Sequence, residues 1–403
     1  MIQTAILGFG TVGSGVAEVL TGHEESISRK VHELIGLKYI LDIRDFSASP
    51  FADKFVQDFS VIEHDPEVDI VVETIGGVTV ALDYTVRALK AGKSVVTSNK
   101  ELVAEHGYEL LQLAKEHGVS YLFEASVGGG IPILRPMTAC LAVNELSQVT
   151  GILNGTTNYI LTRMIRAGLT FDQALKEAQE KGYAEQDPTA DVDGHDACRK
   201  ICILAALAFG QHVYPHQVPA LGIRGVGLED VAYADSRGYQ IKLLGRCLRQ
   251  PEGKVCAFVA PHLVPAENPL SGVEDVFNAI SITGNAIGDA MFYGRGAGKL
   301  PTASAVVADV IDIARDLKKD RGSGWGPGAE DLVVSADGLV SRWYVRAQTS
   351  MDQARAACGE IQPLARSGAP AGEAAFLTAA MTESQLREQL QNLEVCSLFR
   401  VLE

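Results

Sequence analysis

A run of acids followed by a lysine is the most chemically suggestive stretch of this sequence. Glu185 to Asp196 holds five carboxylates in twelve residues, and Lys200 follows four positions later, where the apolar run ICILAALAFG begins. Asp196 and Lys200 share a helix face, so a surface ion pair behind an Asp193 cap is the simplest explanation. A lysine on an apolar helix should however be buried, and a buried, paired ammonium can have its pKa tuned for proton transfer. We therefore expect Lys200 to act in catalysis.

A glycine-rich turn near the N-terminus is the second suggestive feature. Residues 6–15 read ILGFGTVGSG, a GxGxxG pattern directly after an apolar run that is typical of a strand. Such glycines allow a tight turn, a close approach of the backbone to a pyrophosphate, and close packing of the next helix, whose N-terminus faces the phosphates. We therefore expect a dinucleotide to bind at Gly8, Phe9, Gly10, Thr11, Val12 and Gly13.

The end of the next predicted strand bears on which dinucleotide binds. Asp42 could accept hydrogen bonds from the ribose hydroxyls of NAD, whereas Arg44 could pair with the 2′-phosphate of NADP. Because Asp42, Arg44 and Asp45 can also lie together in a solvated turn, their charges do not choose between the two cofactors.

Two further turns carry groups that suit a ligand. SVVTSNK, residues 94–100, is predicted to end a strand at the carboxyl edge of the sheet, where ligands bind, and it contains Thr97, Ser98 and Lys100. Lys100 is either a surface lysine at a helix start or a charge in the cleft. The GTT sequence at 155–157 offers free N–H groups and hydroxyls to a carboxylate, although an ordinary threonine cap is the simpler explanation.

A metal site is a possible alternative for the apolar helix. His195, Cys198 and Cys202 are spaced i, i+3, i+7 and share one helical face. Zinc needs a fourth ligand, and the sequence offers no second pair. We expect the two cysteines to belong to the core instead.

The fold that must position these motifs is predicted by the first third of the chain. Five apolar runs typical of strands alternate with amphipathic stretches typical of helices: TAILG, LKYILDI, DIVVETIGG, KSVVTSN and VSYLFEASV. This alternation favours an α/β fold with a Rossmann-type, doubly wound parallel sheet. We expect residues 1–130 to form this dinucleotide-binding domain, completed by a helix at about 300–318.

The pattern changes after Gly130. GGGIPILRPM is predicted to begin a helix, and strands with longer spacing follow. We expect an inserted α+β domain at 131–299, a glycine- and acid-rich linker at 319–330, and a C-terminal domain at 331–403 with the order βαββαβ.

Bulk properties exclude several classes of protein. The net charge is −15, which argues against a surface for nucleic acid. The longest apolar run, residues 201–209, is far shorter than the ~20 residues of a membrane-spanning helix. Seven scattered cysteines without a CxxC pair, and an N-terminus without a signal peptide, indicate a reduced, cytoplasmic protein.

Taken together, these motifs resemble the homoserine dehydrogenase family. The resemblance covers residues 1 to about 315 and rests on GFGTVGSG, VVTSNK, EASVGGGIPI, GILNGTTNYIL, EAQEKGYAEQDPTADVDGHDACRK and FYGRGAGKLPTASAVV. It implies NAD(P)-dependent interconversion of L-aspartate 4-semialdehyde and L-homoserine, on the route to threonine and methionine. The cofactor performs the hydride chemistry, while the protein orients the reactants and neutralises the charge that develops on them.

The resemblance also implies roles for individual residues. Lys200 matches the proton donor, and Lys100 matches a lysine beside the nicotinamide and the substrate. The residues that match the substrate site are Glu185, Asp196, Asp191, Tyr183, Gly182, Gly155 and Thr156. Gly298 lies in a loop that matches one approaching the cofactor. Glu124, with the main-chain oxygens of Val127, Gly129 and Ile131, matches a monovalent-cation site, usually sodium.

The C-terminal residues 331–403 resemble an ACT regulatory domain in element order. Their first predicted turn, within RAQTSMDQARAACG, lacks the Asp-x-Pro-Gly-like sequence that binds a regulatory amino acid in family members. We therefore expect this domain to make contacts within a homodimer rather than to bind threonine as a feedback inhibitor. The family analogy places the dimer contact at the sheet of the catalytic domain.

Two rival functions are weaker. A non-catalytic NAD(P)-binding regulator would not need the lysines and the acids. A phosphorylating semialdehyde dehydrogenase would need a nucleophilic cysteine, and Cys140 has no histidine near it in the sequence.

Overall fold

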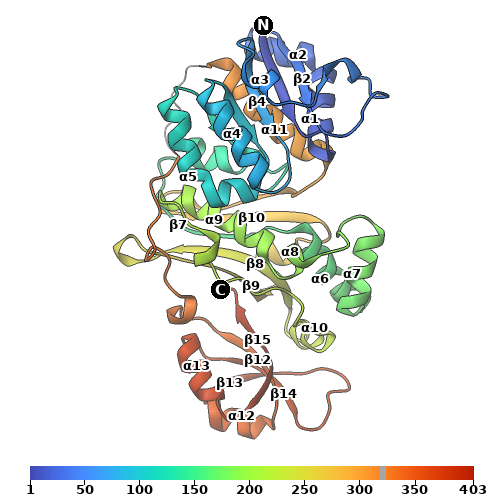
Figure 1. Cartoon of the computed structure of the whole chain (residues 1–403). Coiled ribbons are helices and arrows are strands. Elements are labelled where there is room, and N and C mark those ends of the chain that lie inside the picture. The colour runs from blue at the N-terminus through green and yellow to red at the C-terminus, as the bar shows by residue number, and fades with distance from the viewer. Residues whose placement is uncertain (318–323) are drawn as a thin grey trace.

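The first sheet of the molecule is parallel throughout. The computed structural model describes residues 1–317 and 324–403, which form two sheets and their covering helices (Figure 1). The first sheet has the order β3-β2-β1-β4-β5-β6, with β1 (Ile2–Leu7), β2 (Ile35–Leu41), β3 (Phe55–Val56), β4 (Val68–Glu73), β5 (Ser94–Thr97) and β6 (Tyr121–Leu122). This confirms the predicted doubly wound sheet, although the sequence pattern does not predict the two-residue strand β3.

Both faces of this sheet are buried. Ile6, Ile70 and Val96 share a core with α1 (Thr11–Gly22), α2 (Glu24–Val31) and α11 (Lys299–Arg315). The alternate residues Val71 and Val95 share the other core with α3 (Ser60–Glu63), α4 (Thr79–Lys90) and α5 (Lys100–Glu116). Burial on two faces explains why these strands are continuous apolar runs. The strand order reverses between β1 and β4, so the carboxyl ends of these two strands define the expected ligand crevice.

Helix α11 returns to the first sheet after the strands that the middle of the chain contributes to the second sheet. A Cβ atom at Gly15 of α1 would lie 2.9 Å from the Lys299 carbonyl oxygen and 3.1 Å from Ala303 Cβ. Glycine therefore lets α1 and α11 pack closely. Val306 and Val310 of α11 are fully buried there, and the predicted return helix lies on this sheet.

The second sheet is mixed and has nine strands. Its order is β11-β10-β7-β8-β9-β15-β12-β14-β13, and Figure 1 shows it below the first sheet. The strands from the middle of the chain are β7 (Leu146–Ile152), β8 (Tyr239–Arg249), β9 (Val255–Pro265), β10 (Phe277–Gly284) and β11 (Gly288–Arg295). Their neighbours pair antiparallel. The accompanying helices are α6 (Gly155–Ala167), α7 (Phe171–Glu180), α8 (Thr189–Val192), α9 (His195–Phe209) and α10 (Leu228–Asp235).

One predicted helix is much shorter than expected. GGGIPILRPM leads only into a short helical segment that ends as a π-helical turn at Pro136–Cys140. Glu124 fixes its start, because both carboxylate oxygens accept N–H groups from Ile133, Leu134 and Arg135.

The C-terminal part has the predicted order βαββαβ. It consists of β12 (Trp343–Gln348), α12 (Met351–Cys358), β13 (Ile361–Leu364), β14 (Glu373–Thr378), α13 (Glu383–Leu390) and β15 (Glu394–Val401). Strand β15 joins the larger sheet through two parallel pairs with β9. A buried polar network adds to this junction, since Asp230 of α10 accepts hydrogen bonds from Tyr344 and Arg346 at 2.8 and 2.7 Å.

The predicted linker at 319–330 is described only from residue 324 onward. Residues 319–323 lie outside the described residues. Beyond them, Trp325 is buried, its indole N–H donates to His212 Nδ1 at 2.9 Å, and its ring contacts Phe123 edge to face. The described half of the connection is therefore anchored to the body of the protein.

Candidate active site

Lys200 lies inside the protein, on the second turn of α9. Its exposed fraction is only 8% because α9 is covered by apolar neighbours over most of its surface. Its ammonium donates to Asp196 Oδ2 at 2.6 Å and to the carbonyl oxygen of Leu153 at 2.8 Å. The simple surface ion pair is therefore excluded. Asp193 is not the cap either, because Gly194 occupies that position with a φ of 85° and Asp193 pairs with Arg224.

Asp196 holds a second lysine from the other part of the molecule. Lys100 begins α5 directly after β5, and its Nζ lies 2.9 Å from Asp196 Oδ1. Asn99 caps α5 by accepting the N–H of Leu102, which fixes the helix start. Lys100 thus points into the junction between the two sheets, and its side chain remains 41% exposed.

The three charges shift one another's pKa values. Burial lowers the pKa of Lys200, and the nearby charge of Lys100 lowers it further. Asp196 raises the pKa of Lys100, so that lysine stays charged. Burial alone would raise the pKa of Asp196, but both ammonium groups together hold it well below its usual range. The site therefore combines one permanent cation with one ammonium that releases its proton more readily than a solvated lysine.

The loop before α6 faces this cluster. Asn154 Nδ2 donates to Asp191 Oδ1 at 2.7 Å and to Asp196 Oδ2 at 2.9 Å, and its Oδ1 accepts the N–H of Thr157. Burial, followed by the charge of Asp196, raises the pKa of Asp191. The loop and the acids thus form one connected polar cluster.

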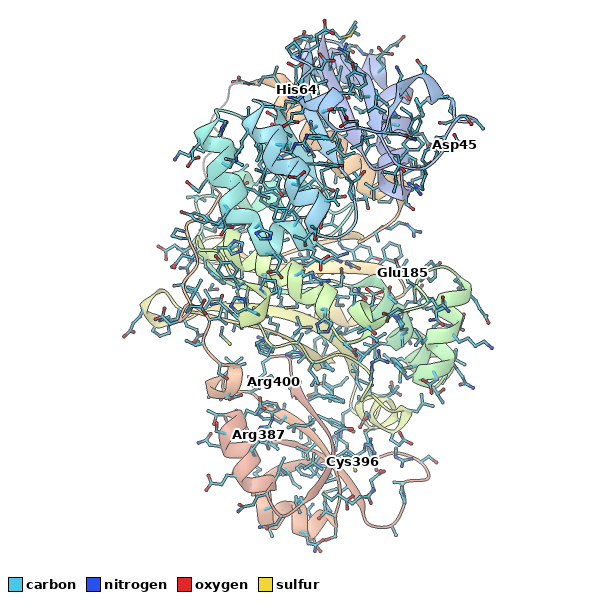
Figure 2. The ribbon with its side chains drawn as sticks, in the orientation of Figure 1. Asp45, His64, Glu185, Arg387, Cys396 and Arg400 are labelled. Atoms are coloured by element: carbon cyan, nitrogen blue, oxygen red, sulfur yellow. The ribbon has the colours of Figure 1, made fainter. Side chains whose placement is uncertain are left out.

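The other predicted substrate residues surround the same loop. The Thr156 hydroxyl donates to the Tyr183 carbonyl at 2.7 Å, and the Tyr183 ring stays 44% exposed. A Cβ at Gly155 would lie 2.8 Å from the Val276 carbonyl oxygen, so only glycine fits there. Gly182 has a φ of 73° and turns the chain after α7. Glu185 is exposed on the loop that follows (Figure 2), and no described side chain bonds to its carboxylate.

The glycine turn has the geometry that a dinucleotide requires. Gly8 has a φ of 87°, and a Cβ at Gly13 would lie 1.9 Å from the Gly8 carbonyl oxygen. A Cβ at Gly10 would meet nothing within 4 Å, so the backbone there is open to a ligand. Thr11 and Val12 form the first turn of α1, whose N-terminus has no side-chain cap. These N–H groups are available to phosphate oxygens.

Asp42 and Arg44 form one unit at the end of β2. Arg44 Nε and Nη2 donate to the two Asp42 oxygens at 2.9 and 2.7 Å, and the N–H of Phe9 donates to Oδ2 at 2.7 Å. Arg44 thereby holds the pKa of Asp42 well below its usual range. The pair lies beside the glycine turn, but the Asp42 oxygens already have partners.

The carboxyl end of β5 is linked to a buried acid. The Thr97 hydroxyl donates to Glu73 Oε2 at 2.5 Å and accepts the N–H of Asn99 at 2.9 Å. Burial raises the pKa of Glu73 to about 7. Ser98 follows at the strand end, where its N–H reaches the Glu73 carbonyl oxygen. These residues therefore lie at the carboxyl ends of β4 and β5, next to the expected crevice.

The predicted cation residues lie where two loops cross. A Cβ at Gly129 would lie 2.3 Å from the Gly296 carbonyl oxygen, so the 127–131 loop contacts the 294–298 loop that carries Gly298. Glu124, Val127 and Ile131 are buried. Oxygen donors of this kind suit a hard cation, but the Glu124 carboxylate already serves three amide N–H groups.

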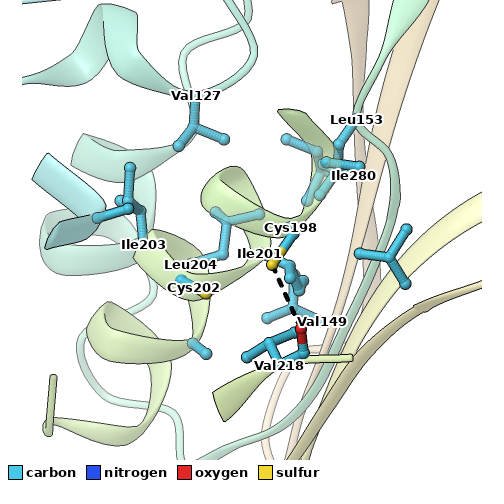
Figure 3. Close-up of a cluster of buried hydrophobic side chains, with 14 of the residues drawn as sticks. Val127, Val149, Leu153, Cys198, Ile201, Cys202, Ile203, Leu204, Val218 and Ile280 are labelled. Carbon is cyan, nitrogen blue, oxygen red and sulfur yellow. Dashed lines mark hydrogen bonds between the residues drawn. The ribbon is translucent and has the colours of Figure 1, made fainter. Parts of the chain in front are cut away.

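Cys198 and Cys202 lie on α9 with their side chains in the apolar core. Figure 3 shows them among Val127, Ile201 and Leu204, with the Cys198 thiol directed at the Val218 carbonyl oxygen, 3.5 Å away. Among the described residues, no group of three or more His, Cys, Asp or Glu side chains is arranged to hold a metal ion.

Comparisons with known proteins give the family of this chain. A family model described as the NAD binding domain of homoserine dehydrogenase matches residues 8–124, and a homoserine dehydrogenase model matches residues 132–311. Homoserine dehydrogenase of Bacillus subtilis (strain 168) is 40% identical over 353 residues, which cover 86% of this chain and 81% of that protein. The enzyme of Lactococcus lactis is 42% identical over 355 residues, covering 86% and 83%. The chain belongs to the homoserine dehydrogenase family.

Solved homoserine dehydrogenases share the fold. The structure from Thiobacillus denitrificans superposes with a TM-score of 0.90 at 34% identity and covers 100% of this chain and 98% of its own. A hyperthermophilic archaeal homoserine dehydrogenase in complex with NADPH has a TM-score of 0.65 at 29% identity, covering 77% and 97%. This chain, as a homoserine dehydrogenase, is an NAD(P)-dependent oxidoreductase.

Two members of the cluster in this homoserine dehydrogenase are not predicted from the sequence. The Leu153 carbonyl oxygen gives no sequence signal because it is main chain. Asn154 does give one, since asparagine before a helix is a preferred N-cap. Its contacts with Asp191 and Asp196 depend on folding and have no local signal.

No helix of the described residues is long and apolar enough to cross a membrane.

Proposed function

We propose that the chain interconverts L-aspartate 4-semialdehyde and L-homoserine with NAD(P), on the route to threonine and methionine. The observation that carries this proposal is the buried Lys200 ammonium, held by Asp196 and a carbonyl oxygen beside a nucleotide-binding fold. Reduction of an aldehyde builds negative charge on its oxygen, and a preorganised donor stabilises that charge.

Lys200 acts as the proton donor. When bound, the nicotinamide supplies the hydride to the aldehyde carbon. Lys200 Nζ gives one N–H proton to the aldehyde oxygen, and the neutral amine that remains is reprotonated from solvent. Burial assists this step because it lowers the pKa of Lys200. Lys100 stays charged and stabilises the oxygen electrostatically, while Asp196 orients both ammonium groups through its two oxygens.

The substrate is a zwitterion, so its ammonium group needs negatively charged partners and its carboxylate needs hydrogen-bond donors. Glu185 and Asp196 hold the polar groups of the substrate, with Gly182, Tyr183 and Asp191 lining the same pocket. Gly155 and Thr156 offer the first N–H groups of α6 to the carboxylate. The direct contact between Thr156 and Tyr183 supports one shared pocket.

The turn from Gly8 to Gly13 would hold the cofactor's phosphates, and Thr97, Ser98, Lys100 and Gly298 would be the residues near its nicotinamide. NAD and NADP remain alternatives for this chain. Arg44 is largely exposed and suits a 2′-phosphate, whereas Asp42 suits a ribose hydroxyl. The archaeal relative was solved in complex with NADPH, which carries a 2′-phosphate.

A sodium ion would be held by the main-chain oxygens of Val127, Gly129 and Ile131, with Glu124. Since three amides already use the Glu124 carboxylate, its part in that site is confined to the lone pairs that they leave. The ion would stiffen the junction where the 127–131 and 294–298 loops meet.

The domain boundaries and the assembly also belong to this proposal. We assign residues 1–130 with α11 to the cofactor, 131–299 to substrate and dimerisation, and 331–403 to an ACT-like domain. Met291 and Tyr293 of the edge strand β11 are exposed, which supports a homodimer contact on this sheet. The seven cysteines are all free, which supports a reducing, cytoplasmic location.

The deciding experiment is a spectrophotometric assay of homoserine oxidation with NAD and with NADP separately. We expect reduction of at least one cofactor that depends on homoserine. An inactive protein that binds cofactor but not homoserine would overturn the proposed function.

A further inference from the structure

The Asn154 side chain uses both ends of its amide at the centre of the polar cluster. It is 5% exposed. Oδ1 accepts from the N–H of Thr157 at 2.8 Å and from the Thr157 hydroxyl at 3.0 Å. Nδ2 donates one hydrogen bond to Asp191 at 2.7 Å and one to Asp196 at 2.9 Å. One side chain therefore connects the start of α6 to two acids on other elements.

The two acids need such a donor because they are neighbouring like charges, with Asp196 buried and Asp191 half-buried. Burial and the neighbouring Asp196 already raise the pKa of Asp191. Hydrogen bonds from a neutral N–H favour the ionised forms of both acids without adding charge. A primary amide provides an acceptor for the helix and two donors for the acids, which no hydroxyl or carboxylate can provide together.

The Asn154 amide also determines which oxygen of Asp196 contacts which lysine. Asp196 Oδ2 accepts from both Asn154 and Lys200, while Oδ1 faces Lys100 at 2.9 Å. Rotation of this carboxylate would break the contact with Asn154. The amide therefore keeps Lys200 on the oxygen nearest the loop at Leu153, to whose carbonyl the same ammonium donates.

We propose that Asn154 is a positioning residue, which ties the substrate loop at the start of α6 to Asp196, whose carboxylate orients the two lysines, and to Asp191 of the substrate pocket. This inference rests on the proposed function and deepens it. Asn154 touches neither reacting atom in this scheme; it acts through Asp191 and Asp196.

The test distinguishes two roles of Asn154, namely the capping of α6 and the positioning of Asp191 and Asp196. Serine and aspartate are both good N-caps, so Asn154→Ser and Asn154→Asp preserve the cap of α6. Serine can donate to at most one of the two acids, whereas ionised aspartate donates to neither and adds a third carboxylate. Asn268→Ser is the matched control, because Asn268 caps the short helix at Pro269–Gly272 through Leu270 N–H, away from the site.

We expect kcat/KM for homoserine to fall about tenfold or more in Asn154→Ser, since one hydrogen bond to a charged group is worth roughly that factor. The loss should be larger in Asn154→Asp, and Asn268→Ser should match the wild type. Folding is followed by circular dichroism and thermal melting. Retention of wild-type kcat/KM within about twofold in both Asn154 variants would overturn the proposal.

The pH profile distinguishes positioning from a general structural defect. The charged groups that face Asp191 and Asp196 are Lys200 on α9, Lys100 on α5 and, near Lys100, Arg199. Loss of the amide should raise the pKa of Asp191 further. In the direction of aldehyde reduction, where Lys200 stays protonated, the acid limb of kcat/KM should therefore move to higher pH. A structural defect would lower kcat/KM equally at every pH, and this result would also contradict the proposal.

A second readout is independent of enzyme activity. The 13C carboxyl resonance of Asp191, assigned with Asp191→Asn, should titrate at higher pH in Asn154→Ser than in the wild type. An unchanged titration refutes the role of Asn154. If the wild type does not oxidise homoserine, the proposed function fails while this titration still decides whether Asn154 controls the acids.

Discussion

Replacement of Lys200 by methionine is the most direct test of the mechanism. Methionine has similar length and is compatible with the buried position, but it cannot donate a proton. Loss of a general acid typically costs a factor of about 10² to 10⁴ in turnover. Because Lys100 still provides a positive charge 2.9 Å from Asp196, we expect a loss of about 10³ in kcat rather than complete inactivity.

The fold should survive this change for a structural reason. Removing one partner of a buried ion pair usually costs about 3–5 kcal/mol, because a charge is left without compensation. Here Asp196 keeps Lys100 and the Asn154 amide as partners. We therefore expect a smaller destabilisation, about 1–2 kcal/mol, which thermal melting will measure.

The assay should include a charge-preserving variant and the pH dependence. Lys200→Arg keeps the positive charge, but its guanidinium does not release a proton at accessible pH, so it should also lose activity. In the wild type, homoserine oxidation needs neutral Lys200 and should rise with pH, whereas aldehyde reduction needs the ammonium and should fall. The affinity for NADPH, measured by fluorescence titration, should not change. Turnover of Lys200→Met within about threefold of the wild type would refute a proton-transfer role for Lys200.

Three other predictions concern the cofactor, pH and the C-terminal domain. Arg44→Ala should lower the ratio of kcat/KM for NADP over NAD about tenfold or more, since it removes a charge-assisted contact to a 2′-phosphate; an unchanged ratio would remove Arg44 from cofactor selection. Burial, with the charge of Glu124, raises the pKa of Asp309 to about 7. The folded protein therefore keeps a proton that the unfolded chain loses near pH ~4, and stability falls as the pH rises between these values. Asp309→Asn removes this loss of stability. The difference in Tm between Asp309→Asn and the wild type should therefore increase from about pH 5 to about pH 8. A difference that does not change with pH would contradict the raised pKa of Asp309. Millimolar threonine should leave homoserine oxidation unchanged, because Ser350 and Gln353 already cap α12 and occupy the turn after β12; strong inhibition would show that this turn binds an effector.

The parts of the fold with a regular pattern could be predicted from the sequence. Strands β1, β2, β4 and β5 are continuous apolar runs because both faces of the sheet are buried. Strand β3 has two half-buried residues and no such pattern. The helix expected after Gly130 is short: the Glu124 carboxylate accepts its first N–H groups, and the segment ends as the π-helical turn at Pro136–Cys140.

The active site could be predicted only where its residues lie close together along the chain. The spacing of Asp196 and Lys200 indicates a shared helix face, and the apolar flanks indicate burial. The direction of Lys100 was not predictable, because it depends on how α5 and α9 meet. The partner of Lys100 is fixed by this contact, which also includes the Arg199–Glu101 ion pair at 2.6 Å.

The meeting of α5 and α9 has a mechanistic consequence. Lys100 belongs to the sheet that binds the cofactor, whereas Asp196 and Lys200 belong to the helix over the second sheet. The ion pair between Lys100 and Asp196 therefore spans the two parts, and any change in the angle between them must stretch it. Because the same carboxylate holds the Lys200 ammonium at 2.6 Å, such a movement would also shift Lys200. The proposed proton donor is thus correctly placed only when these two parts of the molecule are held together.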